Sequence, residues 1–73
     1  MFTVEFESDA SVITTLDQQD KFNDVEVIIG GDGDIYMRQF DDHLEEYQVL
    51  YMSYQQLMDI MAAINSPEGA YYV

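Results

Sequence analysis

One stretch of the sequence combines residue types capable of acid–base and metal chemistry. Residues 41–46, DDHLEE, place a single histidine, His43, among four carboxylates. Such groups can bind a divalent ion or act as a general acid and base. No nucleophile with an adjacent base accompanies them, so the pattern required for a catalytic site is not met. We therefore predict no catalytic residues and interpret residues 41–46 as the densest part of an acidic surface.

A second stretch, residues 30–34 with the sequence GGDGD, suggests metal or phosphate binding. Asp32 and Asp34 are spaced as in the first half of a calcium loop, but Glu45 lies two residues beyond the twelfth position. No lysine follows, as a phosphate-binding loop would require. The glycines instead suit a tight turn between two strands. We predict such a turn, with no metal and no cofactor.

The strongest signal in the sequence is its charge. Fifteen Asp and Glu residues stand against two Lys and Arg residues, for a formal net charge of −13. Solubility of a small domain needs a magnitude of only about 2 to 8. The excess costs stability through self-repulsion, so we expect a basic protein as partner. The same charge argues strongly against direct binding of nucleic acid, because few cations are present to replace phosphate counterions.

The residues expected to contact that partner are acidic side chains of the turns, one outward acidic side chain on the strand between them (Glu26), and two aromatic residues near the C-terminus. They are Glu26, Asp32, Asp34, Asp41, Asp42, Glu45, Glu46, Tyr71 and Tyr72. Tyrosine is enriched at interface hot spots, and few burial sites remain for the last two. Arg38 is expected to pair with a carboxylate on a neighbouring strand.

One helix is predicted over residues 53–65. Ser53 and Gln56 match a capping box, and Pro67 is expected to stop the helix. An apolar stripe at helical spacing follows the cap, formed by Tyr54, Leu57, Met58, Met61 and Ile64. A helix of this length is marginal alone, so we expect it to fold back across a sheet and bury this stripe.

Alternating or β-branched segments supply that sheet. Residues 2–6, 25–29, 35–40 and 47–52 read as strands, the last of them plausibly central because both of its faces are apolar. Residues 9–20 fit a helix or a strand, and the β-branched run 12–15 favours a hairpin with the first strand. Residues 17–24 are expected to form a loop, anchored by an inward Phe22. The prediction is an α+β domain: an antiparallel meander of three or four strands with one C-terminal helix packed on one face.

Composition limits the chain to one small acidic domain, residues 1–73. An apolar fraction of 48% with ten aromatic residues is too rich for a disordered acidic tail, and no cysteine is available for a disulfide or a zinc thiolate. No run approaches the length of a membrane span, and no signal peptide is recognisable. We expect a cytoplasmic protein with no membrane partner.

Two functions of different classes fit these features, and neither is enzymatic. The first is an inhibitor that mimics nucleic-acid charge and occupies the basic groove of a nucleic-acid-binding enzyme or effector. In size, charge and lack of cysteine the sequence resembles small acidic phage proteins that block host nucleases, glycosylases, restriction enzymes or CRISPR effectors. The alternative is an adaptor or structural accessory protein that binds through its aromatic C-terminal tail or a sheet edge.

Overall fold

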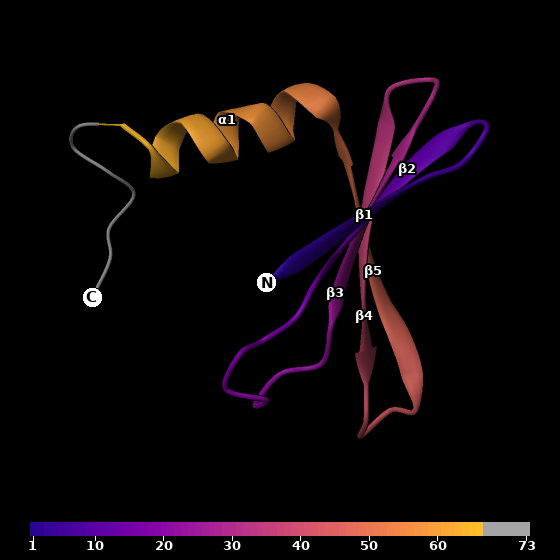
Figure 1. Cartoon of the computed structure of the whole chain (residues 1–73), viewed down its shortest axis with the longest axis vertical. Coiled ribbons are helices and arrows are strands. Elements are labelled where there is room, and N and C mark those ends of the chain that lie inside the picture. Colours follow the sequence, from indigo (N-terminus) through magenta and orange to yellow (C-terminus); the bar gives the residue numbers. More distant parts are fainter. Residues whose placement is uncertain (67–73) are drawn as a thin grey trace.

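The computed structural model describes residues 1–66, which form one antiparallel sheet and one helix (Figure 1). The five strands follow the chain in the order β1-β2-β3-β4-β5, a simple meander. The elements are β1 (Phe2–Phe6), β2 (Ala10–Thr15), β3 (Val25–Gly30), β4 (Asp34–Asp41), β5 (Glu46–Ser53) and α1 (Tyr54–Ile64). The α+β meander is confirmed, with five strands where three or four were expected.

The segment that the sequence left open, residues 9–20, contributes strand β2. Its β-branched residues Val12 to Thr15 pair with β1 on one side and β3 on the other. Side chains that branch at Cβ lose little freedom on a pleated strand, and this favours the extended form over a helix. The hairpin interpretation of this segment is therefore confirmed.

One face of the sheet, which we call the helix-side face, is apolar at its centre, with Ser11, Thr15, Gln39 and Gln48 among its polar residues. Strand register places on this face the side chains of Phe2, Val4, Phe6, Ile13, Val25, Val27, Ile29, Ile35, Met37, Leu50 and Met52. The only charged residues in register with them are Asp41 and Glu46, which pair at the far end of β4 and β5. Fifteen carboxylates in the chain thus leave the centre of this face uncharged.

On the opposite face, which we call the tyrosine face, side chains of neighbouring strands contact one another in pairs. Glu26 and Arg38 are register partners, with Nε 2.9 Å from Oε1 and Nη2 3.2 Å from Oε2. The Arg38 guanidinium also lies 5.0 Å from the Tyr47 ring centroid, a cation–π contact. Tyr36 and Tyr51 pack together with ring centroids 5.5 Å apart. The expected cross-strand partner for Arg38 is confirmed.

Helix α1 begins directly after β5, with no intervening loop. Ser53 ends the strand and also caps the helix: its Oγ accepts from the Gln56 amide, and its own amide donates to the Gln56 side chain. The predicted capping box is confirmed. Ile35, the register partner of Ile29 and Met52 near this junction, is fully buried (0% exposed).

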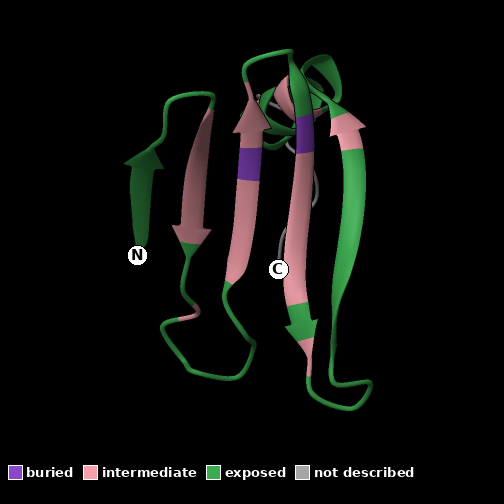
Figure 2. Cartoon of the chain, turned by 90° about the vertical axis from the view of Figure 1, so that its right-hand side faces the viewer, coloured by how far each residue is buried: buried purple, intermediate pink, exposed green. Residues whose placement is uncertain are grey.

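Beyond its first turns the helix does not lie across the sheet. Figures 1 and 2, seen 90° apart, show α1 leaving one end of the sheet to one side, and among the strands it packs chiefly against β5. Leu57 and Met58 are half-buried, whereas Met61 and Ile64 are exposed. The expected packing along one face is therefore wrong beyond the first turns, because a strand that continues straight into a capped helix fixes the direction in which the helix leaves.

Two other expectations are corrected by the structure. β5 lies at the edge of the sheet and is not central, since α1 follows it and no strand pairs with its outer side in residues 1–66. Phe22 is 71% exposed and anchors nothing. The Asp17 carboxylate organises that loop instead, accepting backbone hydrogen bonds from residues 19, 21 and 22. The buried core of the described residues is small, consisting of Ile28 and Ile35 (Figure 2).

Candidate functional site

The end of the sheet away from the helix, which we call the acidic end, collects carboxylates from two loops. In a meander, alternate connections lie at the same end of the sheet, so the β2–β3 loop meets the β4–β5 turn there. Together they carry Asp17, Asp20, Asp24, Asp41, Asp42, Glu45 and Glu46. Lys21 is the only lysine or arginine in these loops. The four carboxylates of residues 41–46 thus share one end of the sheet with the three carboxylates of the β2–β3 loop.

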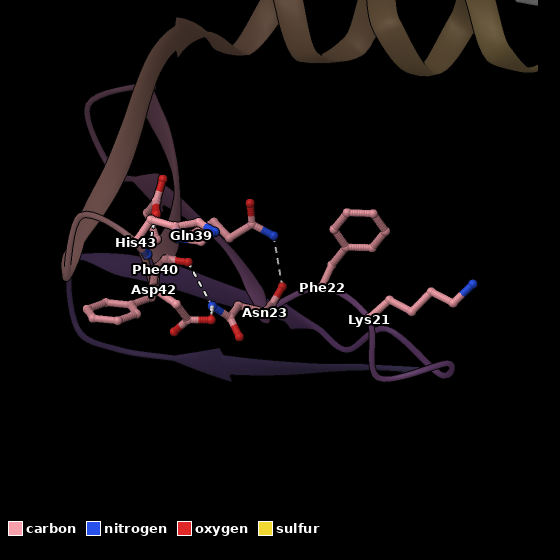
Figure 3. Close-up of a pocket in the computed structure, with 8 residues that line it drawn as sticks. Lys21, Phe22, Asn23, Gln39, Phe40, Asp42 and His43 are labelled. Atoms are coloured by element: carbon pink, nitrogen blue, oxygen red, sulfur yellow. Dashed lines mark hydrogen bonds between the residues drawn. The ribbon is translucent and has the colours of Figure 1, made fainter.

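Asn23 joins the two loops. Its side-chain amide donates to the backbone carbonyl of Phe40 at 2.8 Å and to Oδ2 of Asp42 at 3.1 Å. Its backbone carbonyl accepts from the Gln39 side chain at 2.9 Å. Figure 3 shows Asn23 between Gln39 and Asp42, with Lys21 extending away from the Asp42 carboxylate. These bonds hold residues 23 and 42, which are distant in sequence, in one arrangement.

Two of the carboxylates stabilise the loops themselves. Asp41 accepts from the amides of His43 (2.8 Å) and Leu44 (3.1 Å) and from the Gln48 side chain (2.9 Å). Asp17 accepts three backbone amides, and the bonds from Gln19 and then Lys21 hold the pKa of its carboxyl below the ordinary 3.8, because they stabilise the charged form. Asp17 and Asp41 are therefore committed to structure.

Four other carboxylates at the acidic end are exposed to solvent, whereas the Asp42 carboxylate accepts a hydrogen bond from the Asn23 side chain. Within residues 1–66, the side chains of Asp20, Asp24, Glu45 and Glu46 form no hydrogen bond, and the only ion pair is that of Glu26 with Arg38. Asp20 and Glu45 also adopt left-handed backbone conformations, with φ of 58° and 55°. This conformation is strained for residues with a Cβ, and least favourable for those other than Asn and Asp. Glutamate thus occupies a turn position where glycine would fit better.

Two open hollows flank the junction of the loops. One, of about 460 Å³, is lined by Lys21, Phe22, His43 and neighbouring residues (Figure 3). The other, of about 480 Å³, is lined by Thr14, Asp24, Tyr47 and others. Both include Asn23 and Asp42. Neither brings a nucleophile next to a base, and residues 1–66 hold no group of three or more His, Cys, Asp or Glu side chains suited to a metal ion. The arrangement is suited to contact with a cationic surface.

The structure separates the residues predicted to bind a partner into distinct groups. Residues 41, 42, 45 and 46 lie together at the acidic end, as expected of one loop. Asp32 and Asp34 lie in the β3–β4 turn at the opposite end, where Asp32 accepts from the Asp34 amide. Glu26 is on the tyrosine face, engaged by Arg38. Tyr71 and Tyr72 lie outside the described residues.

Sequence reasoning missed the contribution of the β2–β3 loop to the acidic end. Its carboxylates Asp17, Asp20 and Asp24 were treated as an ordinary polar connection. The signal was available, because strand order in a meander dictates which loops share an end. In the part of the chain that the structure describes, no helix has the length and apolar character needed to cross a membrane.

A family model with the description "Domain of unknown function (DUF8831)" matches residues 3–63. The chain belongs to this family. The match runs from β1 through nearly all of α1, so the DUF8831 unit comprises the whole sheet together with its projecting helix. Tyr71 and Tyr72 fall outside it. No curated protein and no solved structure is similar to the chain.

Proposed function

We propose that this chain is a non-catalytic, acidic protein-binding domain whose acidic end docks into the basic nucleic-acid-binding groove of another protein. The observation that carries the proposal is the hydrogen bonding of Asn23 to Phe40 and Asp42, which ties together two loops that carry seven carboxylates and a single lysine at one end of the sheet. Lysine and arginine side chains that line a phosphate-binding groove accept carboxylates as well as phosphates.

The way the loops are built favours binding. Carboxylates presented on ordered backbone lose less conformational freedom on association than carboxylates on a mobile tail. Asp17 and Asp41 order the two loops internally, and Asn23 ties them to each other. The carboxylates of Asp20, Asp24, Glu45 and Glu46 are left free to accept hydrogen bonds from a partner. The acidic end therefore presents its charge in a prearranged form.

The strained turn also supports the proposal. Backbone strain in a non-glycine residue persists where the surrounding structure enforces it, and it clusters at functional positions. Glu45 occupies the left-handed position of the β4–β5 turn, where it adds charge at a cost in turn stability. If the protein is a phage-type inhibitor that mimics nucleic-acid charge, the partner recognises this charge.

The test compares two variants of equal charge. The acidic-end variant carries Asp20→Asn, Asp24→Asn, Glu45→Gln and Glu46→Gln, and spares the three carboxylates that form hydrogen bonds in the loops, Asp17, Asp41 and Asp42. The control variant carries Glu5→Gln, Glu7→Gln, Asp9→Asn and Asp59→Asn, and removes the same charge from other elements. Each is immobilised and used to capture proteins from lysate at about 50 and about 500 mM NaCl, since ionic contacts are screened at the higher value.

We expect the wild type and the control variant to retain a basic nucleic-acid-binding protein at low salt and release it at high salt. The acidic-end variant should lose most of this binding, because charge pairs at an interface govern association and affinity. Equal binding of that protein by the acidic-end variant would refute the proposal.

The adaptor function remains the second candidate because of one observation. β5 is an eight-residue edge strand that carries no proline and no lysine, the residues that usually protect an edge. Such a strand can pair with a peptide strand from a partner. Binding that survives both high salt and neutralisation of the acidic end would favour this function.

A further inference from the structure

The helix-side face of the sheet is left largely uncovered by the described chain. Phe2 is 68% exposed and Leu50 is 60% exposed, at opposite edges of the face. Between them Ile13, Val27 and Met37 are only half-buried. Monomeric soluble proteins rarely expose a continuous apolar patch of such width.

The protein's own helix is unable to cover this face. A helix that packs on the sheet it follows needs a connection that reverses the chain, and here Ser53 belongs to both β5 and the cap of α1. The hydrogen bonds between Ser53 and Gln56 fix the helix at this junction. The helix therefore stands out from the sheet, and its residues Ile60, Met61 and Ile64 are exposed as well.

The total accessible surface area also indicates that part of the described chain is left uncovered. The chain has an accessible surface of 6163 Å² and a mass of 8.5 kDa, whereas a compact monomer of that mass exposes about 4,700 Å². If residues 67–73 are given the full surface of an unfolded segment, about 1,100 Å², the other residues still exceed the value for their mass by about 700 Å². Each partner in a standard interface buries about 800 Å².

We propose that the helix-side face is covered by a second copy of this chain. The helix projects from the sheet at an angle (Figures 1 and 2), and both carry exposed apolar side chains, so a two-fold axis would bring the same apolar surfaces of two copies together. The two sheets then pack face to face, about 10 Å apart, and each helix lies across the end of the other sheet. The tyrosine faces remain outside.

Charge placement selects a second copy over an unrelated cationic partner. A chain with a net charge of −13 associates with itself only through a surface free of carboxylates. The helix-side face is such a surface, with Asp41 and Glu46 at its acidic-end border and α1 carrying only Asp59. A basic partner gains nothing from this face. The inference is independent of the proposed function, which concerns the acidic end.

The primary test is the mass of the full chain in solution. Sedimentation equilibrium in about 300 mM NaCl, which screens the charge to within a few ångströms, should give twice 8.5 kDa, about 17 kDa, at micromolar concentration. Its melting temperature should rise with protein concentration, as for any fold stabilised by association. A folded species of 8.5 kDa with a melting temperature independent of concentration would overturn the inference.

Neighbouring residues on β5 provide a matched pair of variants. Leu50→Gln places an amide in the helix-side face, and Tyr51→Gln makes a comparable change one residue later, on the tyrosine face. Both leave the net charge unchanged. Leu50→Gln acts twice in the dimer and should raise the dissociation constant about 100-fold or more. Tyr51→Gln also removes the contact with Tyr36, but it should change the dissociation constant of the dimer by no more than a few-fold.

Two alternative results would overturn the inference. One is loss of the dimer in Tyr51→Gln with its retention in Leu50→Gln, which would place the interface on the tyrosine face or the β5 edge. The other is a full chain that is monomeric while a chain of residues 1–66 dimerises, which would assign the covering role to residues 67–73. If Leu50→Gln does not fold, the concentration dependence of the wild-type melting temperature still decides.

Discussion

At the acidic end, hydrogen bonds to polar and charged side chains order the loops. Asp17, Asn23 and Asp41 do that work, and Phe22 is left exposed. On the helix-side face the situation is reversed, with many apolar side chains, few charges and no covering layer. The two surfaces therefore differ in the kind of partner that we propose for them, a cationic protein for the first and an apolar surface for the second.

This contrast explains how a chain with a net charge of −13 can still carry an interface for self-association. Carboxylates lie in the turns, on the tyrosine face and at the sheet ends, where water solvates them. Their absence from the centre of the helix-side face allows two copies to approach there. The charge and the apolar surface are therefore separated in space, and one does not cancel the other.

The largest expected effect tests the core near the junction of β5 and α1. Ile35→Ala should lower the free energy of unfolding by about 2 to 4 kcal/mol, as for other buried large-to-small changes. Ile35 is fully buried, whereas Met61 is 48% exposed, so Met61→Ala should cost less than about 1 kcal/mol at low protein concentration. Urea unfolding at two protein concentrations measures both.

The comparison becomes sharper at high concentration. If a second copy covers α1, the cost of Met61→Ala should increase as the protein associates, while the cost of Ile35→Ala changes little. A Met61→Ala cost that is large at low concentration would mean that the helix is buried within a single chain, contrary to its position in the structure.

A smaller effect of opposite sign is expected in the acidic-end turn. Glu45→Gly should raise the free energy of unfolding by up to about 1 kcal/mol, because glycine adopts a positive φ without steric cost. Glu46→Gly removes the same charge from the start of β5, where glycine weakens a strand, and should destabilise. Thermal unfolding of the two variants separates backbone strain from charge. Equal shifts in both would attribute the effect to repulsion alone.

The smallest effect concerns the β2–β3 loop and its dependence on pH. The folded state depresses the pKa of Asp17, so its contribution to stability is present above the unfolded value, near 3.8, and is lost as pH falls through the folded pKa. Asp17→Asn should therefore destabilise the protein at pH 7, and the difference from the wild type should shrink below pH 4. Urea unfolding at pH 7, 5 and 3 measures this difference.

Asp20→Asn is the control for that experiment, since the Asp20 carboxylate accepts no hydrogen bond within residues 1–66. The difference in stability between Asp20→Asn and the wild type should not grow comparably as the pH rises from 3 to 7. A difference between Asp17→Asn and the wild type that stays constant from pH 7 to 3 would show that the backbone hydrogen bonds of Asp17 do not depend on its charge.

Local features of this fold were predictable from sequence, and features that depend on the placement of whole elements were not. The Ser53 cap, the residue 30–34 turn and a carboxylate partner for Arg38 follow from spacing and residue type. The direction of α1 could not be predicted in this way, because it depends on α1 starting directly after β5 with no linking residue between them. Phe22 was wrongly expected to anchor its loop because it is hydrophobic. The loop is held instead by backbone hydrogen bonds to the Asp17 carboxylate.

The candidate site was predictable in part. The cluster of residues 41–46 is visible as a run of acidic letters, but its extension by Asp20 and Asp24 requires the strand order. Glu26 seemed a free carboxylate in the sequence, and only the register with Arg38 shows that it is engaged. Tyr71 and Tyr72 remain a prediction.

The most direct measurement of the proposed function is displacement of DNA from the captured partner. A fluorescent duplex is bound to that protein, and the wild type, the acidic-end variant and the control variant are added in turn. The wild type and the control variant should release the duplex, while the acidic-end variant should require a far higher concentration. A stable ternary complex, with the duplex and this protein bound together, would contradict charge mimicry.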